Sequence, residues 1–442
     1  MRTHLRGFSL KLDKRLLLLG AAAIAFLPAT ANAQSLRGAL NSAEPQSNFA
    51  RDRNVGVRQR AHPGYEAVGL RAGAFMVWPK LNATVERNDN IFASETNEQD
   101  DTVFHIAPEI SAQSTWSRHF LSAYGRALVH RYSDFSTEDT EDYFVGATGR
   151  LDVLRSANIN GALEWSRQTE PRTSAAAEDQ ARPIQFEVTS GYLATSREFN
   201  RMRLSARADV RSFIYLAERL NRPQDDRDRT ISTLMGRADY AVSPDTALFV
   251  QITGNKRAYR LQNPPPAAFP NFIDRDSEGF EVLAGANFEV SALARGEIGL
   301  GYLKQNFQDG RLGDIDGFGG RGQVEWFPTE LVTVTLAGSR IIEDAAVVGS
   351  SGYLSNNLSA QVDYELLRNV ILTGQVGWGE DDYKGIDRTD KRTTAGLSAT
   401  YLVNRRVGVT VSYNYFKQDS KGLAAGNDFT VNRVGGTLTL QY

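Results

Sequence analysis

The sequence predicts an all-β fold, a transmembrane antiparallel up-and-down β-barrel of about 18 strands, with about 16 strands as the alternative count. Three observations predict this class. The chain of 442 residues opens with an export signal, most of the remainder alternates between apolar and polar residues, and the connections between alternating stretches are by turns short and long. Export removes the chain from the cytoplasm, and the other two patterns are typical of a barrel that crosses a membrane.

The N-terminus has the three parts of a secretory signal peptide. Five basic residues lie within residues 2–15, an apolar stretch runs from Leu16 to Leu27, and Ala31 and Ala33 form an A-x-A cleavage site. That stretch is too short to cross a membrane as a helix, which needs about 20 apolar residues. A short buried helix is the alternative. We expect residues 1–33 to be a signal peptide that is removed from the mature chain.

Composition excludes several classes of site. The chain has no cysteine, which rules out disulfides and thiolate metal sites. Its formal charge of −2 becomes −6 once the basic signal peptide is removed, so the basic surface typical of nucleic-acid binding is missing. No other stretch is apolar enough to span a membrane as a helix. We expect no metal, no cofactor and no nucleic-acid partner.

Residues 34–71 form a polar segment with glycine, proline and arginine and with little periodicity. Such composition favours a flexible or loosely docked segment on the periplasmic side of the membrane. A plug inside the lumen is the alternative, although plugs are usually larger.

Residues 72–442 alternate with a period of two, which sends successive side chains to opposite faces of a strand. Around residue 206, for example, Leu204, Ala206 and Ala208 alternate with Arg203 and Arg207. Many alternating runs exceed the five or six residues usual for strands of soluble sandwiches, and they approach the length of tilted strands that cross a bilayer. A soluble secreted β protein is the alternative that this length disfavours.

The predicted strands follow one another along the whole barrel region, with boundaries uncertain by two to four residues. In chain order they are residues 73–89, 102–115, 118–132, 142–154, 157–169, 184–196, 199–215, 229–242, 246–260, 278–290, 295–306, 318–327, 330–343, 353–364, 369–381, 391–402, 405–417 and 427–442. Their connections alternate between tight turns and longer loops, the latter including 344–352 and 382–390. Short periplasmic turns and long outer loops are the pattern of outer-membrane barrels, and an even strand count puts both termini in the periplasm.

The polar phase of these strands supplies candidate pore-lining residues. On the inward face we expect a mixture of arginines and acids: Arg126, Arg150, Asp152, Arg203, Arg207, Asp209, Arg211, Arg237 and Asp239. Six of these residues form three R-x-D pairs, namely Arg150 with Asp152, Arg207 with Asp209, and Arg237 with Asp239. One hypothesis is a mixed-charge field that selects solutes, and the other is a network of ion pairs that braces the wall. The two are compatible.

Two further groups of residues have less specific interpretations. Acidic runs, such as Glu380, Asp381 and Asp382, suggest outer loops that are simply solvated or that bind lipopolysaccharide through divalent cations. His105 and His130 fall on the inward face, and no G-x-S-x-G or H-E-x-x-H motif accompanies them. We therefore expect no catalytic residues and no enzyme activity.

The last strand carries a resemblance. Its end, Leu438-Thr439-Leu440-Gln441-Tyr442, resembles the C-terminal signal that the barrel-assembly machinery reads in outer-membrane barrels. The resemblance implies that Val434, Leu438, Leu440 and Tyr442 form this signal and point outward into lipid.

The start of the barrel carries a more specific resemblance. Residues 60–70 (RAHPGYEAVGL), 73–79 (GAFMVWP) and 86–92 (ERNDNIF) resemble the opening of the outer-membrane β-barrel porin families of proteobacteria. These families are often associated with export of exopolysaccharide or capsule. The resemblance implies a porin-like channel of a Gram-negative outer membrane that supports exopolysaccharide export, with polysaccharide export components as partners. The alternatives are a general diffusion porin for small hydrophilic solutes and a closed structural or adhesive barrel.

Overall fold

The computed structural model describes residues 55–174, 181–216, 224–261, 273–290, 293–345, 347 and 349–442. The predicted signal peptide, its cleavage site at Ala31 and Ala33, and residues 34–54 of the polar segment lie outside the described residues.

Nearly all of the regular structure is β-strand. The strands are β1 (Leu70–Ala72), β2 (Phe75–Asn88), β3 (Asp101–Ser114), β4 (Phe120–Tyr132), β5 (Thr140–Leu154), β6 (Ala157–Thr169), β7 (Gln185–Phe199), β8 (Met202–Leu216), β9 (Arg229–Ser243), β10 (Thr246–Tyr259), β11 (Ser277–Val290), β12 (Ala294–Phe307), β13 (Ile315–Thr329), β14 (Val332–Glu343), β15 (Gly352–Leu367), β16 (Val370–Lys384), β17 (Thr389–Leu402), β18 (Val407–Lys421) and β19 (Phe429–Gln441). Two 3-10 helices, η2 (Ser136–Glu138) and η3 (Asp225–Arg227), lie in connections. In the described part of the chain, no helix is long and apolar enough to cross a membrane.

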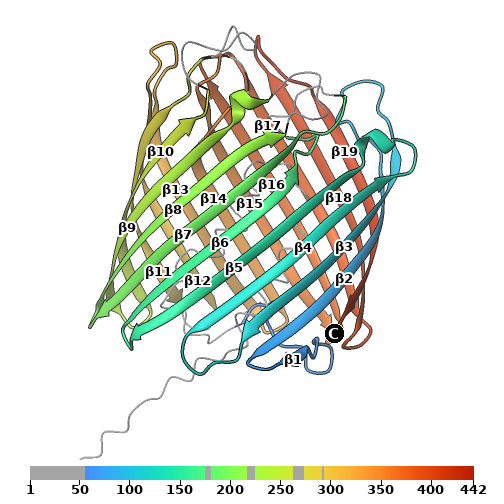
Figure 1. Ribbon diagram of the computed structural model, residues 1–442, viewed down its shortest axis with the longest axis vertical. Helices are drawn as coiled ribbons and strands as arrows, with labels where there is room; N and C mark the ends of the chain where they lie inside the picture. Colours follow the sequence, from blue (N-terminus) through green and yellow to red (C-terminus); the bar gives the residue numbers. More distant parts are fainter. Residues whose placement is uncertain are drawn as a thin grey trace, which may run out of the picture.

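Eighteen of these strands, β2 to β19, form a closed antiparallel barrel, which confirms the predicted fold class and count (Figure 1). Each strand pairs with its neighbours in sequence, and β19 closes the ring on β2 from Arg433 opposite Asn88 to Gln441 opposite Lys80. Closure gives each of these eighteen strands a partner on both sides, as a spanning sheet in lipid requires. The short β1 adds a small antiparallel pair to β2 at the end of the barrel where the C-terminus lies.

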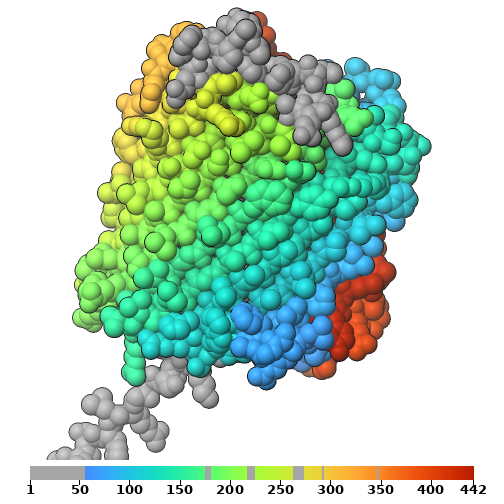
Figure 2. Space-filling model, in the orientation of Figure 1, coloured from blue at the N-terminus to red at the C-terminus, as the bar shows by residue number. Residues whose placement is uncertain are grey.

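The two faces of the wall differ as the alternation predicts. On β8, the apolar side chains of Leu204, Val210 and Ile214 are 41–51% exposed. Arg203 and Arg207, on the other face of the same strand, are each 8% exposed. The apolar set faces outward and the charged set faces the lumen, the reverse of a soluble barrel with an apolar core. The strands cross the outer surface as oblique bands, because closing a barrel requires them to tilt (Figure 2).

Connection length separates the two ends of the barrel, as predicted. Turns of two residues join β7 to β8, β9 to β10 and β13 to β14 at one end, while the connections after β2, β6, β8 and β10 at the other end are much longer. One predicted loop is wrong in extent. Residues 382–390 do not form a long loop, because β16 runs to Lys384 and β17 begins at Thr389.

Two acidic residues in that region, Asp381 and Asp390, are inward-facing strand residues and not loop residues. Asp381 and Asp390 lie opposite one another on β16 and β17, and both side chains are fully buried. Arg392 donates to Asp381 at 2.7 Å, and Arg388 holds Asp390 at 2.7 Å. Charges that pair inside the lumen have the same appearance in the sequence as charges on a solvated loop.

The described part of the polar segment, residues 55–69, is docked against the inside of the barrel at the short-turn end. Val57, which is fully buried, donates its main-chain N–H to Thr333 Oγ1 at 2.9 Å. Arg60 forms an ion pair with Glu365 at 3.3 Å, and Gln441 lies 3.5 Å from the carbonyl of Tyr65. Specific contacts to β14, β15 and β19 therefore hold this part of the segment along the rim.

Candidate functional site in the barrel lumen

All nine predicted pore-lining residues lie on the lumen phase of their strands. Their outward neighbours are exposed apolar residues, such as Leu151 and Val153 on β5 and Leu234 on β9. The register between neighbouring strands shows which charged residues lie opposite one another, which the sequence alone does not predict. Arg203 on β8 lies directly opposite Asp239 on β9.

The R-x-D repeats are ion pairs within single strands. Arg150 Nε is 3.0 Å from Asp152 Oδ1, Arg207 Nη2 is 2.6 Å from Asp209 Oδ1, and Arg237 Nη2 is 2.8 Å from Asp239 Oδ1. Residues two apart on a strand share a face, so an extended arginine reaches the carboxylate beside it. The spacing thus presents a guanidinium and a carboxylate together on the lumen wall.

Aromatic rings support several of these guanidinium groups from the neighbouring strand. The Arg207 guanidinium lies 4.0 Å from the ring centroid of Tyr192, and that of Arg237 lies 3.9 Å from the centroid of Phe249. Arg126 lies 4.3 Å from the centroid of Phe144. A planar guanidinium that stacks on a ring loses side-chain freedom, which fixes the direction of its hydrogen-bond donors.

Arg237 contacts carboxylates on two strands. Besides Asp239, it donates to both carboxylate oxygens of Glu297, at 2.7 and 2.8 Å. Glu297 also accepts from Asn287 at 3.1 Å. Glu297 belongs to β12 and Arg237 to β9, so this contact joins two strands that are not neighbours in the sheet. It spans part of the lumen cross-section.

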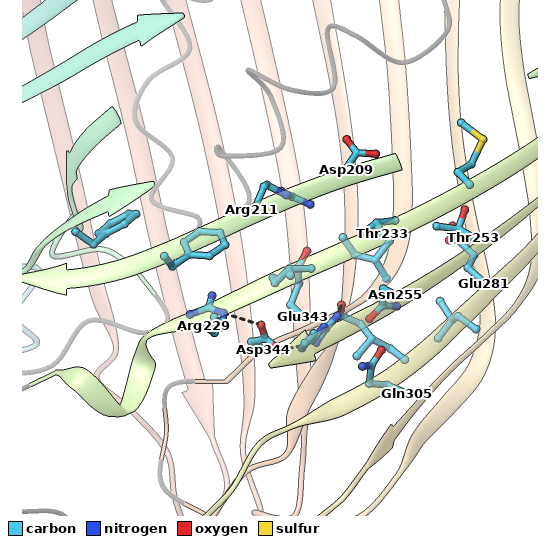
Figure 3. A pocket seen from close by; sticks show the side chains of 18 of the residues that line it. Asp209, Arg211, Arg229, Thr233, Thr253, Asn255, Glu281, Gln305, Glu343 and Asp344 are labelled. Atoms are coloured by element: carbon cyan, nitrogen blue, oxygen red, sulfur yellow. Dashed lines mark hydrogen bonds and ion pairs between the residues drawn. The ribbon is translucent and has the colours of Figure 1, made fainter. Parts of the chain in front are cut away.

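A cavity of about 420 Å³ lies inside the barrel, within reach of the long connections (Figure 3). Of the predicted residues, Arg207, Asp209 and Arg211 line it, and the other six do not. Six basic and six acidic described residues line this cavity: Arg207, Arg211, Arg229, Arg257, Lys304, Arg321, Asp142, Glu170, Asp209, Glu281, Glu343 and Asp344. The lining also includes amide and hydroxyl side chains, the rings of Phe186, Phe213 and Tyr215, and aliphatic side chains such as Ile231 and Ile341. The charged groups of the cavity wall are therefore balanced in sign and lie among polar and apolar side chains.

One side of this cavity is formed by the start of the β14–β15 connection. Arg229 Nε on β9 is 3.0 Å from Asp344 Oδ2, and Arg257 on β10 pairs with Asp344 Oδ1. Arg257 also donates to the carbonyl of Ile342 at 3.1 Å, and Arg275 donates to the carbonyl of Ala345 at 2.8 Å. Burial alone would raise the pKa of Asp344, but Arg257 and Arg229 outweigh it and hold that pKa below its usual value.

Other connections at the same end are joined to their neighbours by ion pairs. Arg227 in η3 holds Glu170, from the β6–β7 connection, through two hydrogen bonds of 2.8 and 3.0 Å. Arg172 holds Glu138 of η2 through two more, of 2.7 and 3.0 Å. Glu170 lines the cavity. The described parts of these connections are fixed by ion pairs.

Sequence reasoning did not find the residues of these cross-lumen contacts. Arg229, Arg257 and Glu297 follow the inward phase of their strands, so the alternation that identified the other candidates includes them. Asp344 and Glu170 lie just beyond strand ends, where alternation stops and gives no signal. Their role depends on how the connections fold.

The two inward histidines contact one another. His105 and His130 lie directly opposite on β3 and β4, with their Nδ1 atoms 2.6 Å apart, and Glu86 Oε1 is 3.7 Å from His105 Nε2. No serine takes part in these contacts. Among the described residues, no group of three or more histidine, aspartate or glutamate side chains is arranged to hold a metal ion.

The predicted assembly residues point outward from the closing strand. Val434, Leu438, Leu440 and Tyr442 are 39–54% exposed, and Thr437 and Thr439 between them hydrogen-bond to Thr84 and Asn82 of β2 at 2.8 Å. The outward set thus forms an apolar stripe at the barrel closure.

Comparison with solved structures finds similarity to several Pseudomonas proteins. A BenF-like porin from Pseudomonas fluorescens Pf-5 has 10% identity and a TM-score of 0.46, covering 84% of this chain and 99% of that chain. OccK2 (OpdF) from Pseudomonas aeruginosa has 9% identity and a TM-score of 0.46, covering 86% and 99%. The siderophore receptor PirA from Pseudomonas aeruginosa has 9% identity and a TM-score of 0.42, covering 83% and 80%. No curated protein sequence matches the chain.

Comparison with family models gives a match over most of the chain. The family described as "Putative beta-barrel porin 2" matches residues 62–442, from the docked N-terminal segment to the last residue of the barrel. The match therefore includes the opening and closing segments whose resemblance to porins was noted above, together with every strand of the barrel. This chain belongs to that family of outer-membrane β-barrel porins.

Proposed function

We propose that this porin is a passive conduit for hydrophilic solutes and that it serves the export of exopolysaccharide across the outer membrane. The observation that carries the first part is the cavity inside the closed barrel, with six basic and six acidic described residues in its wall. Balanced charge lowers the barrier for neutral and weakly charged solutes without selecting strongly for one sign.

The lining also has the chemistry that recognises saccharides. Carboxylates, guanidinium groups and amides give paired donors and acceptors for sugar hydroxyls, and Phe186, Phe213 and Tyr215 offer apolar ring faces. The resemblance of residues 60–92 to porins associated with exopolysaccharide export points in the same direction. A general diffusion porin would use the same wall, so permeation of small solutes alone does not separate the two functions.

The orientation follows from the same proposal. Both termini lie in the periplasm, and the long connections face outward toward lipopolysaccharide. The barrel-assembly machinery recognises Val434, Leu438, Leu440 and Tyr442, and polysaccharide export components deliver the polymer to the rim that residues 55–69 line. The barrel performs no catalysis and needs no cofactor.

Deletion of the gene tests the export function. We expect loss of surface polysaccharide, measured by extraction and uronic-acid or hexose assay, with unchanged uptake of small sugars by whole cells. Expression of the wild-type chain should restore the polymer. Unchanged polysaccharide together with reduced uptake of small solutes would favour the general diffusion porin instead.

A further inference from the structure

Three arginines converge on the first residues of the β14–β15 connection. They are Arg229 of β9, Arg257 of β10 and Arg275, two residues before β11, and we call them the arginine triad. Arg229 and Arg257 grip the two oxygens of the Asp344 carboxylate, while Arg275 binds the adjacent carbonyl of Ala345. Two guanidinium groups thus bind one carboxylate, and a third binds the adjacent main-chain carbonyl.

The carboxylate in this site follows the end of β14, whose last residues pair with β15 but not with β13. Pairing between β13 and β14 stops at Gly320 opposite Arg340, although β13 begins at Ile315 and β14 continues to Glu343. Asp344 reaches β9 and β10, which lie five and four strands from β14 around the ring, respectively. Asp344 is therefore a tethered group at the end of a hairpin, held in the triad by polar contacts.

The arginine triad borders the cavity through which we propose solutes pass. Arg229, Arg257 and Asp344 all line it, and their side chains keep 10–13% exposure. Figure 3 shows Asp344 directed toward Arg229 beside the cavity residues Asn255 and Glu343. A solute in the cavity comes within reach of the same two guanidinium groups that hold Asp344.

From this arrangement we propose that the arginine triad is a binding site for the carboxylate of an acidic saccharide, which Asp344 occupies until the solute displaces it. The inference rests on the proposed saccharide conduit and names the substrate class of its cavity. Guanidinium groups bind carboxylates through two parallel hydrogen bonds, and a uronate presents the same two oxygens as an aspartate. Displacement releases the Asp344 side chain from Arg229 and Arg257, while the hydrogen bonds to the carbonyls of Ile342 and Ala345 keep the main chain in place.

Calorimetry on the detergent-solubilised barrel tests the site without requiring conduction. Glucuronate is the probe, glucose is the neutral sugar of matched size, and acetate is the carboxylate without a sugar. Asp344→Asn should bind glucuronate at least tenfold more tightly than wild type, because the tethered competitor has lost its charge. Glucose should show no such gain, and acetate should bind more weakly than glucuronate.

The control variant is Asp309→Asn, which alters an Arg–Asp pair in the β12–β13 connection outside the cavity lining. It should bind glucuronate as wild type does. Adding Arg257→Gln to Asp344→Asn should abolish the gain. Asp344→Ser provides a second variant if Asp344→Asn does not give heat-modifiable, folded barrel.

Equal glucuronate affinity in wild type, Asp344→Asn and the Arg257→Gln double variant would overturn the site. Equal affinity for acetate and glucuronate would overturn the saccharide class. Failure of the export function appears separately, as unchanged surface polysaccharide in the deletion strain, because binding to the purified barrel does not depend on it.

Discussion

At the scale of single residues, the lumen wall is built from arginines whose position is fixed twice, by a carboxylate and by an aromatic ring. Arg207 has Asp209 and Tyr192, and Arg237 has Asp239 and Phe249. The R-x-D spacing in the sequence could not separate a solute filter from a structural brace. In the structure each R-x-D pair lies within one strand, and Arg237 also joins its strand to Glu297 of β12, so a bracing role for Arg237 can be tested.

Removing one partner of a buried ion pair measures how much that pair contributes to the stability of the barrel. Arg237→Ala leaves the carboxylates of Asp239 and Glu297 without their guanidinium, and we expect the barrel to lose about 3 kcal/mol of unfolding free energy. Urea unfolding in lipid vesicles provides the measurement. Arg311→Ala, which removes an exposed guanidinium paired with Asp309, should cost much less unfolding free energy. Equal losses in the two variants would contradict a bracing role for Arg237.

The balanced charge of the cavity makes a second prediction at this scale. The double variant Arg207→Ala and Arg211→Ala removes two of the six basic groups from its described lining. The remaining acids then dominate, so the reversal potential in a salt gradient should shift toward cation selectivity. Arg311→Ala serves as the control, because it lies outside the cavity. An unchanged reversal potential would rule out a contribution of these two arginines to ion selection.

At the scale of elements, the alternation of apolar and polar residues predicts every strand of the barrel to within a few residues. It fails where charged residues that suggest a loop are buried in a strand. Asp381 and Asp390 looked like loop acids, and they are buried strand residues because Arg392 and Arg388 pair with them. The hairpin tip at Asp344 could not be predicted for a related reason. Its position depends on contacts with β9 and β10, which are distant in sequence, and local pattern carries no information about them.

The closing strand β19 ends in Tyr442, and its role in barrel assembly can be tested by substitution. We propose that Tyr442 is part of the assembly signal, so Tyr442→Ala should lower the fraction of heat-modifiable barrel in the outer membrane. Tyr413→Ala is the matched control, since this tyrosine of β18 also faces outward and is equally exposed, at 38% against 39%. Both variants lose one exposed ring, but only the first alters the end of the chain. Equal assembly of the two would contradict the signal.

At the scale of the whole molecule, the even strand count places both termini at one end of the barrel, and the short turns and long connections lie at opposite ends. We propose from these features which end faces the periplasm. The sequence predicted both features, because each depends only on where alternation stops and starts. It could not predict how the lumen is filled, since the register that brings Arg237 to Glu297 or Arg229 to Asp344 is set by the closed ring.

Single cysteines test that orientation cleanly, because the chain has none of its own. Gly310→Cys lies in the β12–β13 connection with open space around it, and Arg155→Cys lies in the exposed two-residue turn between β5 and β6. In intact cells a membrane-impermeant maleimide should label the first variant and not the second. After lysis both should be labelled. The opposite pattern in intact cells would invert the proposed orientation.

The central claim is that the charged, balanced lumen conducts hydrophilic solutes. Single-channel recording of the purified, refolded mature chain in a planar bilayer tests it most directly. The account predicts discrete openings with similar permeability to potassium and chloride, since six basic and six acidic described residues line the cavity. A folded, heat-modifiable barrel that shows no openings would contradict it and would assign this chain to closed structural barrels.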